Sequence, residues 1–196
     1  RRYFAAYCQY SSRYDKLQQG DAANVFRTSM SGGATMDIGV YTIYPMVALF
    51  GMPQSINAQG IILSGGVDGQ AAVNMTYPDM NATVVYSKIA DSYLPSEIEG
   101  EKGNLLMSGI HVIHDVTFIP HRKPMSGQGP EEERQAVGVE IDKSDYFYET
   151  AEFIDLVEKG KSESENNSWE NSYNTLRVTD EIRRQLGVVF PTDSAK

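Results

Sequence analysis

Two side chains that can hold or move a proton lie four residues apart in the first quarter of the sequence, where Asp37 and Tyr41 flank Gly39. In an α-helix, residues at this spacing project from one face, so we expect the carboxylate and the phenol to share one volume, with Tyr44 further along that face. Gly39 bears no side chain and lets a ligand or another backbone approach closely. On periodicity alone, a packing role for the pair remains the alternative.

Helical and β patterns along the chain indicate which elements position this pair. Apolar residues three and four apart predict a helix over about residues 34–50, with a kink or break near Tyr44 caused by Pro45. Strand composition is seen at residues 1–10, 55–63, 70–77, 82–89, 97–100, 105–109 and 112–119. Their short links predict an antiparallel sheet, and helices over 146–159 and 169–186 follow.

A polar connection, residues 11–31, precedes the first helix. Ordering so long a segment without regular structure is costly, so we expect part of a pocket there. Arg13 is suited to hydrogen-bond a hydroxyl or a carboxylate of a substrate, and Asn24 is a second candidate contact. Solvent-facing roles are the alternative for both. A later segment, residues 121–135, is expected to be a mobile surface loop.

Composition excludes several classes of function. A net charge of −9 disfavours nucleic acid as a partner, because phosphate binding requires clustered Lys and Arg. Cys8 is the only cysteine, so no internal disulfide or Cys-based zinc site forms, which fits the cytoplasm. His111 and His114 would point to opposite faces of a strand, so we expect no metal. No apolar run reaches the ~20 residues that span a bilayer.

Nucleotide-binding signatures are missing from this sequence. None of its glycine-rich spots reads GxGxxG between a strand and a helix, and none ends in GK[ST]. The chain opens without Met at Arg1, and strand-like composition follows at once. We therefore expect it to be an excised domain, or one that lost an amino-terminal part.

The stretch from Gly32 to Tyr41, followed by Leu49-Phe50-Gly51-x-Pro53, resembles the start of the carboxy-terminal domain in the glucose-fructose oxidoreductase/inositol dehydrogenase/MocA family. Tyr41 stands where many members have His, which is most similar to the dimeric dihydrodiol dehydrogenase branch. The segments 11–17 and 187–191 also resemble that branch. The resemblance thus covers nearly the whole chain.

The resemblance implies an α+β fold, with an open, mostly antiparallel sheet flanked by helices as in the carboxy-terminal domain of glyceraldehyde-3-phosphate dehydrogenase. Residues 1–196 would form a substrate-binding and oligomerisation domain. A Rossmann domain absent from this chain would bind NAD or NADP. The family pattern further implies a homodimer or higher homo-oligomer through the sheet.

By the family pattern, Tyr41 takes the place of the catalytic acid/base, and Asp37 that of a carboxylate that orients the substrate or the acid/base. The implied reaction is hydride transfer to or from a sugar, polyol or dihydrodiol. A cation that favours the phenolate would come from a Glu-Lys-Pro segment of the Rossmann domain, which this sequence lacks, so the chain alone should be inactive. The alternative is a non-catalytic module that binds a sugar-like ligand or drives dimerisation.

Overall fold

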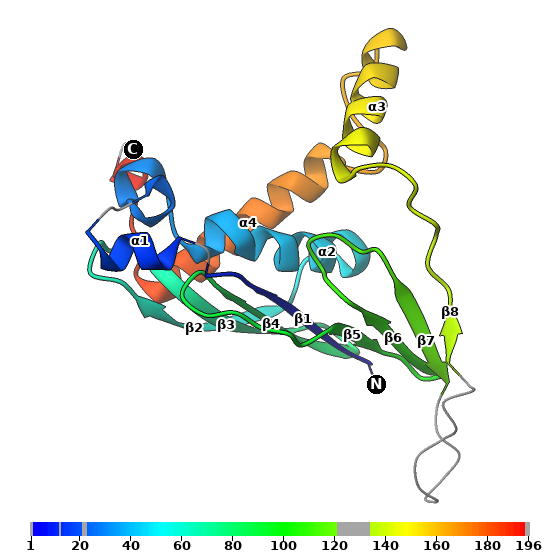
Figure 1. Cartoon of the computed structure of the whole chain (residues 1–196), viewed down its shortest axis with the longest axis horizontal. Coiled ribbons are helices and arrows are strands. Elements are labelled where there is room, and N and C mark those ends of the chain that lie inside the picture. The colour runs from blue at the N-terminus through cyan, green and yellow to red at the C-terminus, as the bar shows by residue number, and fades with distance from the viewer. Residues whose placement is uncertain (1, 12, 21–22, 121–133, 195–196) are drawn as a thin grey trace, which may run out of the picture.

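The structure, a computed structural model, describes residues 2–11, 13–20, 23–120 and 134–194. Eight strands within these residues form one sheet in the order β2-β3-β4-β1-β5-β6-β7-β8 (Figure 1). All neighbouring strands are antiparallel except β1 and β4, which are parallel over their whole length. The expected α+β fold with an open, mostly antiparallel sheet is confirmed.

The strands are β1 (Arg2–Gln9), β2 (Ser55–Ile62), β3 (Asp68–Thr76), β4 (Met80–Ser87), β5 (Ser96–Glu99), β6 (Gly103–Met107), β7 (Val116–Pro120) and β8 (Gln135–Ala136). The α-helices are α1 (Tyr14–Gln18), α2 (Val40–Phe50), α3 (Asp145–Glu158) and α4 (Trp169–Leu186). A π-helical turn, Thr35–Gly39, leads directly into α2.

Helices α2 and α4 cover one face of the sheet and form the core with it (Figure 1). Side chains along β3 alternate between buried and exposed, as expected of a strand with one covered face. Fully buried residues in the core include Phe4, Val84, Ile43 and Ile182, from β1, β4, α2 and α4 respectively. The outward residues of β3, among them Asn74, stay exposed.

Local sequence explains the limits of α4, which agree with the expected 169–186. The hydroxyl of Ser168 accepts a hydrogen bond from the backbone N–H of Asn171 at 3.1 Å, satisfying a free donor at the start of the helix. Gly187 ends the helix with a φ of 73°, a left-handed conformation that glycine adopts without steric cost.

Three sequence-based expectations need correction. The 34–50 helix begins as the π-helical turn, and α2 then runs unbroken through Pro45. The polar connection contains α1 and two short 3₁₀ turns, because local backbone hydrogen bonds order it. The last long strand, β7, begins at Val116 rather than 112. The 121–135 loop lies almost wholly outside the described residues.

Helix α3 stands away from the sheet (Figure 1), and none of its residues is buried. It carries several exposed apolar side chains, including Phe147, Phe153 and Val157.

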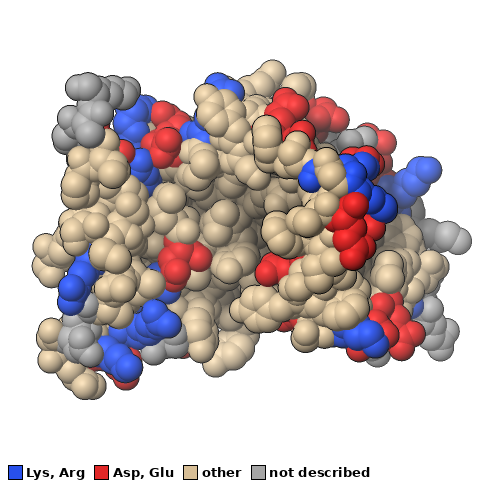
Figure 2. All heavy atoms as spheres, turned by 90° about the horizontal axis from the view of Figure 1, so that it is seen from above, with Lys and Arg blue, Asp and Glu red and all other residues tan. Residues whose placement is uncertain are grey.

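Seen from the helical side, uncharged residues cover much of the middle of the molecule, and charged residues gather mainly toward its edges (Figure 2). No helix among the described residues is long and apolar enough to cross a membrane.

Candidate active site

Tyr41 lies in the wall of a cavity of about 610 Å³. Its side chain projects from the first turn of α2 and is 48% exposed, so its phenol is accessible to a ligand. No Asp, Glu, Lys or Arg is among the described residues that line this cavity. Its lining combines phenol, hydroxyl, imidazole and apolar side chains.

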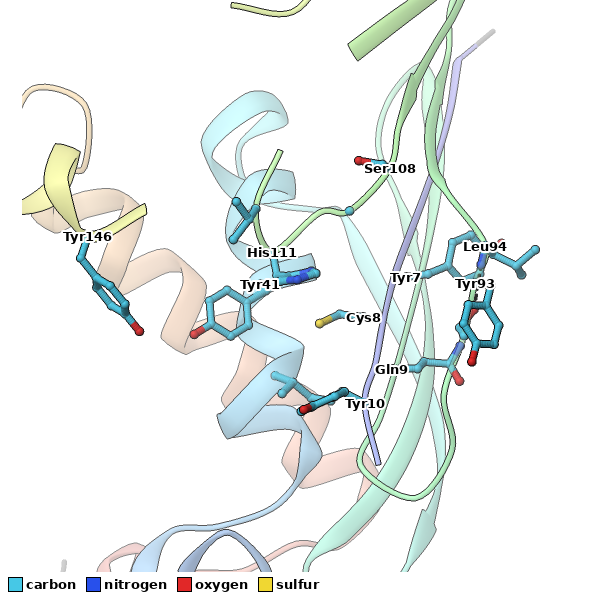
Figure 3. Close-up of a pocket in the computed structure, with 14 residues that line it drawn as sticks. Tyr7, Cys8, Gln9, Tyr10, Tyr41, Tyr93, Leu94, Ser108, His111 and Tyr146 are labelled. Atoms are coloured by element: carbon cyan, nitrogen blue, oxygen red, sulfur yellow. Dashed lines mark hydrogen bonds between the residues drawn. The ribbon is translucent and has the colours of Figure 1, made fainter. Parts of the chain in front are cut away.

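The cavity extends around the end of β1, and its two sides differ (Figure 3). Cys8 and Tyr10 project toward Tyr41, whereas Tyr7 and Gln9 project to the other side of the strand. Side chains alternate along a strand, and this alternation divides the lining.

His111 and Tyr146 of α3 line the same cavity as Tyr41, and Figure 3 shows the Tyr146 hydroxyl pointing toward the Tyr41 side. His111 belongs to the segment between β6 and β7, which the sequence pattern assigned partly to a strand. Gly109 leaves room for its ring, because a Cβ there would stand 3.2 Å from an imidazole carbon. Phenol, imidazole and further hydroxyl groups thus converge on one space.

The structure places Asp37 in the π-helical turn, paired with a lysine. Its carboxylate accepts a hydrogen bond from the ammonium of Lys88, a residue just beyond β4, and forms an ion pair with it. It lines a separate, smaller cavity of about 170 Å³ together with Asn24 and Ser31. Asp37 thus lines the smaller cavity and Tyr41 the larger one, and a shared substrate volume for the two side chains stays a prediction.

A buried network fixes the π-helical turn that separates Asp37 from Tyr41. The Asp68 carboxylate accepts hydrogen bonds from the Thr35 backbone N–H at 2.7 Å and from its hydroxyl at 2.8 Å. The Thr35 hydroxyl also lies 2.8 Å from the hydroxyl of Tyr86. Burial raises the pKa of both Asp68 and Tyr86, against the opposing effect of the Thr35 hydrogen bonds. The turn is therefore attached to β3 and β4 through groups that water does not reach.

The remaining expected site residues are dispersed. Asn24 is exposed at the rim of the smaller cavity. Tyr44 is half-buried, and its hydroxyl donates to the Asn166 carbonyl at 3.5 Å. Arg13 is exposed at the start of α1 and lines neither of the two cavities. Of the five residues singled out in the sequence, the geometry brings Asn24 and Asp37 together.

Sequence reasoning missed three residues at or near the site: Tyr10 and His111, which line the Tyr41 cavity, and Lys88, which pairs with Asp37. Tyr10 follows directly on a strand and His111 lies near a glycine, but neither position forms a motif with Tyr41. Lys88 offered one signal, a charged residue at the end of an otherwise apolar β pattern. Among the residues that the structure describes, no group of three or more His, Cys, Asp or Glu is placed to hold a metal ion.

Solved structures of oxidoreductases share this architecture. The aldose-aldose oxidoreductase from Caulobacter crescentus, complexed with glycerol, superposes with a TM-score of 0.69 over 93% of this chain and 52% of that one, at 15% identity. The UDP-N-acetylglucosamine 3-dehydrogenase from Acidithiobacillus ferrooxidans gives 0.66 over 94% and 53%, at 13% identity. This chain thus shares its fold with about half of each of those two proteins.

A family model described as the GFO/IDH/MocA C-terminal domain matches residues 4–106. Scyllo-inositol 2-dehydrogenase (NADP(+)) IolU of Bacillus subtilis is 42% identical over 195 residues, which cover 100% of this chain and 57% of the relative. Trans-1,2-dihydrobenzene-1,2-diol dehydrogenase of Danio rerio is 29% identical over 169 residues, 84% of this chain and 49% of the relative. The chain belongs to the GFO/IDH/MocA family, and it spans about half the length of these relatives.

Proposed function

We propose that this chain is the substrate-side domain of an NAD(P)-dependent oxidoreductase that interconverts a secondary alcohol and a ketone on a sugar, a polyol or a dihydrodiol. The observation that carries the proposal is the exposed phenol of Tyr41 in the wall of a cavity of about 610 Å³ that it shares with His111 and further tyrosines. The relatives named as scyllo-inositol and dihydrobenzenediol dehydrogenases support the same class of substrate.

Tyr41 is the proton donor and acceptor in this proposal. In the reductive direction, the phenol donates its proton to the carbonyl oxygen as the carbonyl carbon gains a hydride. In the oxidative direction, the phenolate takes the hydroxyl proton as the carbon loses its hydride. A nicotinamide cofactor, when bound, supplies or accepts that hydride. Asp37 orients a neighbouring substrate hydroxyl from the edge of the smaller cavity.

The residues present fit the uncharged end of such a cofactor rather than its phosphates. The Tyr41 side of the cavity presents phenol and imidazole groups and no charged side chain among its described residues, which suits a nicotinamide ring and a polyol. No glycine-rich phosphate-binding motif occurs in the sequence. We therefore assign the binding of the dinucleotide, NAD or NADP, to a Rossmann domain in the half of the relatives that this chain does not span.

Two properties of the whole protein belong to the same proposal. The face of the sheet opposite α2 and α4 has no helix over it among the described elements (Figure 1), and exposed residues such as Asn74 line it. A homodimer formed through this face would cover it.

We place the protein in the cytoplasm, where a single buried thiol, Cys8, stays reduced.

The test compares this 196-residue chain with the longer polypeptide that contains it and a nucleotide-binding domain. NADH and NADPH are titrated into both, followed by nicotinamide fluorescence, and oxidation of scyllo-inositol and of trans-1,2-dihydrobenzene-1,2-diol is assayed. We expect binding and turnover by the longer polypeptide only. Turnover by the isolated chain, or failure of the longer polypeptide to bind either cofactor, would contradict the proposal and favour a non-catalytic module.

A further inference from the structure

We propose that Lys88 is a positioning residue of this active site: its ammonium holds the Asp37 carboxylate in the orientation that receives a substrate hydroxyl. The inference rests on the proposed function. It assigns a task to a lysine that lies far from the Asp37–Tyr41 motif in sequence and lines neither of the two cavities.

The Lys88 side chain is buried and directed at a single carboxylate. The residue is 5% exposed, and its ammonium donates to Oδ2 of Asp37, whose side chain is 38% exposed. The charge is therefore shielded from water on the Lys88 side, while the carboxylate keeps access to the smaller cavity. Such a pair leaves carboxylate surface free to accept a hydrogen bond from a ligand.

The sheet determines where Lys88 points. Tyr86 and Lys88 are two residues apart at the end of β4, so both project toward the helical face. Tyr86 contacts the π-helical turn at Thr35 and lies beneath Gly39, and Lys88 reaches Asp37 between them. The backbone N–H of Lys88 donates to the Gly69 carbonyl at 2.8 Å, which extends the strand pairing with β3 and fixes the base of the side chain.

The pair also lies close to the Tyr41 cavity. Cys8 lines that cavity, and the pKa of its thiol is raised by burial, lowered by the charge of Lys88 and raised by the charge of Asp37. Both charges therefore act at the wall of the cavity that holds Tyr41. Asp37 lines the smaller cavity and its charge acts at Cys8 in the wall of the larger one, so the carboxylate is placed to orient a substrate whose reacting carbon faces Tyr41.

Burial of a lysine requires a reason, because removing an ammonium from water costs several kcal/mol that an ion pair only partly offsets. An apolar side chain of similar length, such as Met, would fill the same space without that cost. A fixed carboxylate supplies the reason. Misplacing a group that orients the substrate by about 1 Å costs as much as ~100-fold in rate.

The test is a double-mutant cycle in the longer, cofactor-binding polypeptide, with Lys88→Met, Asp37→Asn and both together. We expect Lys88→Met to lower kcat/KM for scyllo-inositol by about tenfold or more in the parent and by less than about twofold in the Asp37→Asn background. NAD(P)H affinity should not change. Lys88→Arg keeps the positive charge and its hydrogen-bond donors and should retain more activity than Lys88→Met. Lys159→Met, which removes an exposed ion pair with Asp155, is the matched control and should be neutral.

Equal losses from Lys88→Met in both backgrounds, or no loss in the parent, would overturn the inference. If Lys88→Met does not fold, Lys88→Arg serves as the test. A loss of kcat/KM in Lys88→Arg as large as that in Asp37→Asn, with unchanged thermal stability of Lys88→Arg, would also overturn the inference. Calorimetric binding of scyllo-inositol is measured for the same set. If the unmutated polypeptide binds scyllo-inositol without turning it over, and the Lys88 and Asp37 substitutions are coupled in that binding, the role of Lys88 is upheld while the oxidoreductase proposal fails. An unmutated polypeptide that neither binds nor turns over scyllo-inositol would overturn both.

Discussion

Gly39 lies against the ring of Tyr86, with so little space that a Cβ at position 39 would stand 3.0 to 3.1 Å from three ring carbons. The glycine lies in the π-helical turn between Asp37 and Tyr41, and Tyr86 projects from β4 beneath it. This contact limits how closely the turn can pack against the sheet. π-Helical turns inside α-helices occur frequently at functional sites.

Gly39→Ala should destabilise the chain by about 1 to 3 kcal/mol, because the added methyl group forces the turn away from a buried ring. Helix propensity acts in the opposite direction and would stabilise the variant by about 1 kcal/mol. Urea denaturation followed by circular dichroism measures the difference in the free energy of unfolding. A more stable variant would show that propensity outweighs the contact and that the turn is free to shift.

Tyr41→Phe in the longer polypeptide should lower kcat by about 10²- to 10⁴-fold, because the variant keeps the ring and loses the group that exchanges a proton. Cofactor affinity should stay unchanged. Steady-state rates and NAD(P)H fluorescence titrations give the two quantities. Tyr173→Phe, at an exposed position on α4, is the matched control. Full activity in Tyr41→Phe would remove the phenol from the reaction.

The stability of the chain should depend on the proton of Asp68. Burial raises the pKa of this carboxyl above its ordinary 3.8, so the folded state retains a proton that the unfolded state has already lost. The resulting stability is present at low pH and is lost as pH rises from about 4 through the folded pKa. Asp68→Asn should flatten this dependence. Unfolding free energies measured from pH 4 to 7 test it, and parallel curves for both proteins would contradict it.

Tyr77 should make the fold sensitive to alkali. Burial raises the pKa of its phenol from 10.0 to about 12, and the hydroxyl donates to the Gly51 carbonyl at 3.2 Å. Because the folded pKa is the higher one, stability is intact below pH 10 and falls by about 2 to 3 kcal/mol as pH rises to 12.

Tyr77→Phe should lower the free energy of unfolding by about 1 kcal/mol at neutral pH, because the hydrogen bond is lost. Between neutral and alkaline pH, however, its unfolding free energy should fall less than that of the parent. Alkaline titration followed by circular dichroism measures the midpoint. Tyr93→Phe, at a fully exposed tyrosine, should leave the midpoint where it is. An unchanged slope in Tyr77→Phe would assign the alkaline loss to another group.

Local patterns in the sequence predicted most elements closely. Helix α4 matches its expected limits because Ser168 and Gly187 are chemical signals for the start and end of a helix. Strands β2 to β6 lie within about two residues of their expected places, since turn residues separate them. The apolar spacing did not predict the π-helical turn, because that spacing is equally compatible with an α-helix. Only the packing of the turn on β3 and β4 distinguishes the two.

The sequence by itself determined the family resemblance, the α+β character, and Asp37 and Tyr41 as the candidate pair, because each depends on residues close together in the chain. Only the tertiary structure paired Asp37 with Lys88 beside a small cavity and brought His111 to the lining of the cavity that holds Tyr41. Lys88 and Asp37 are 51 residues apart. Their contact depends on the register of β4 beneath the turn, and register arises from the pairing of whole strands rather than from any local pattern.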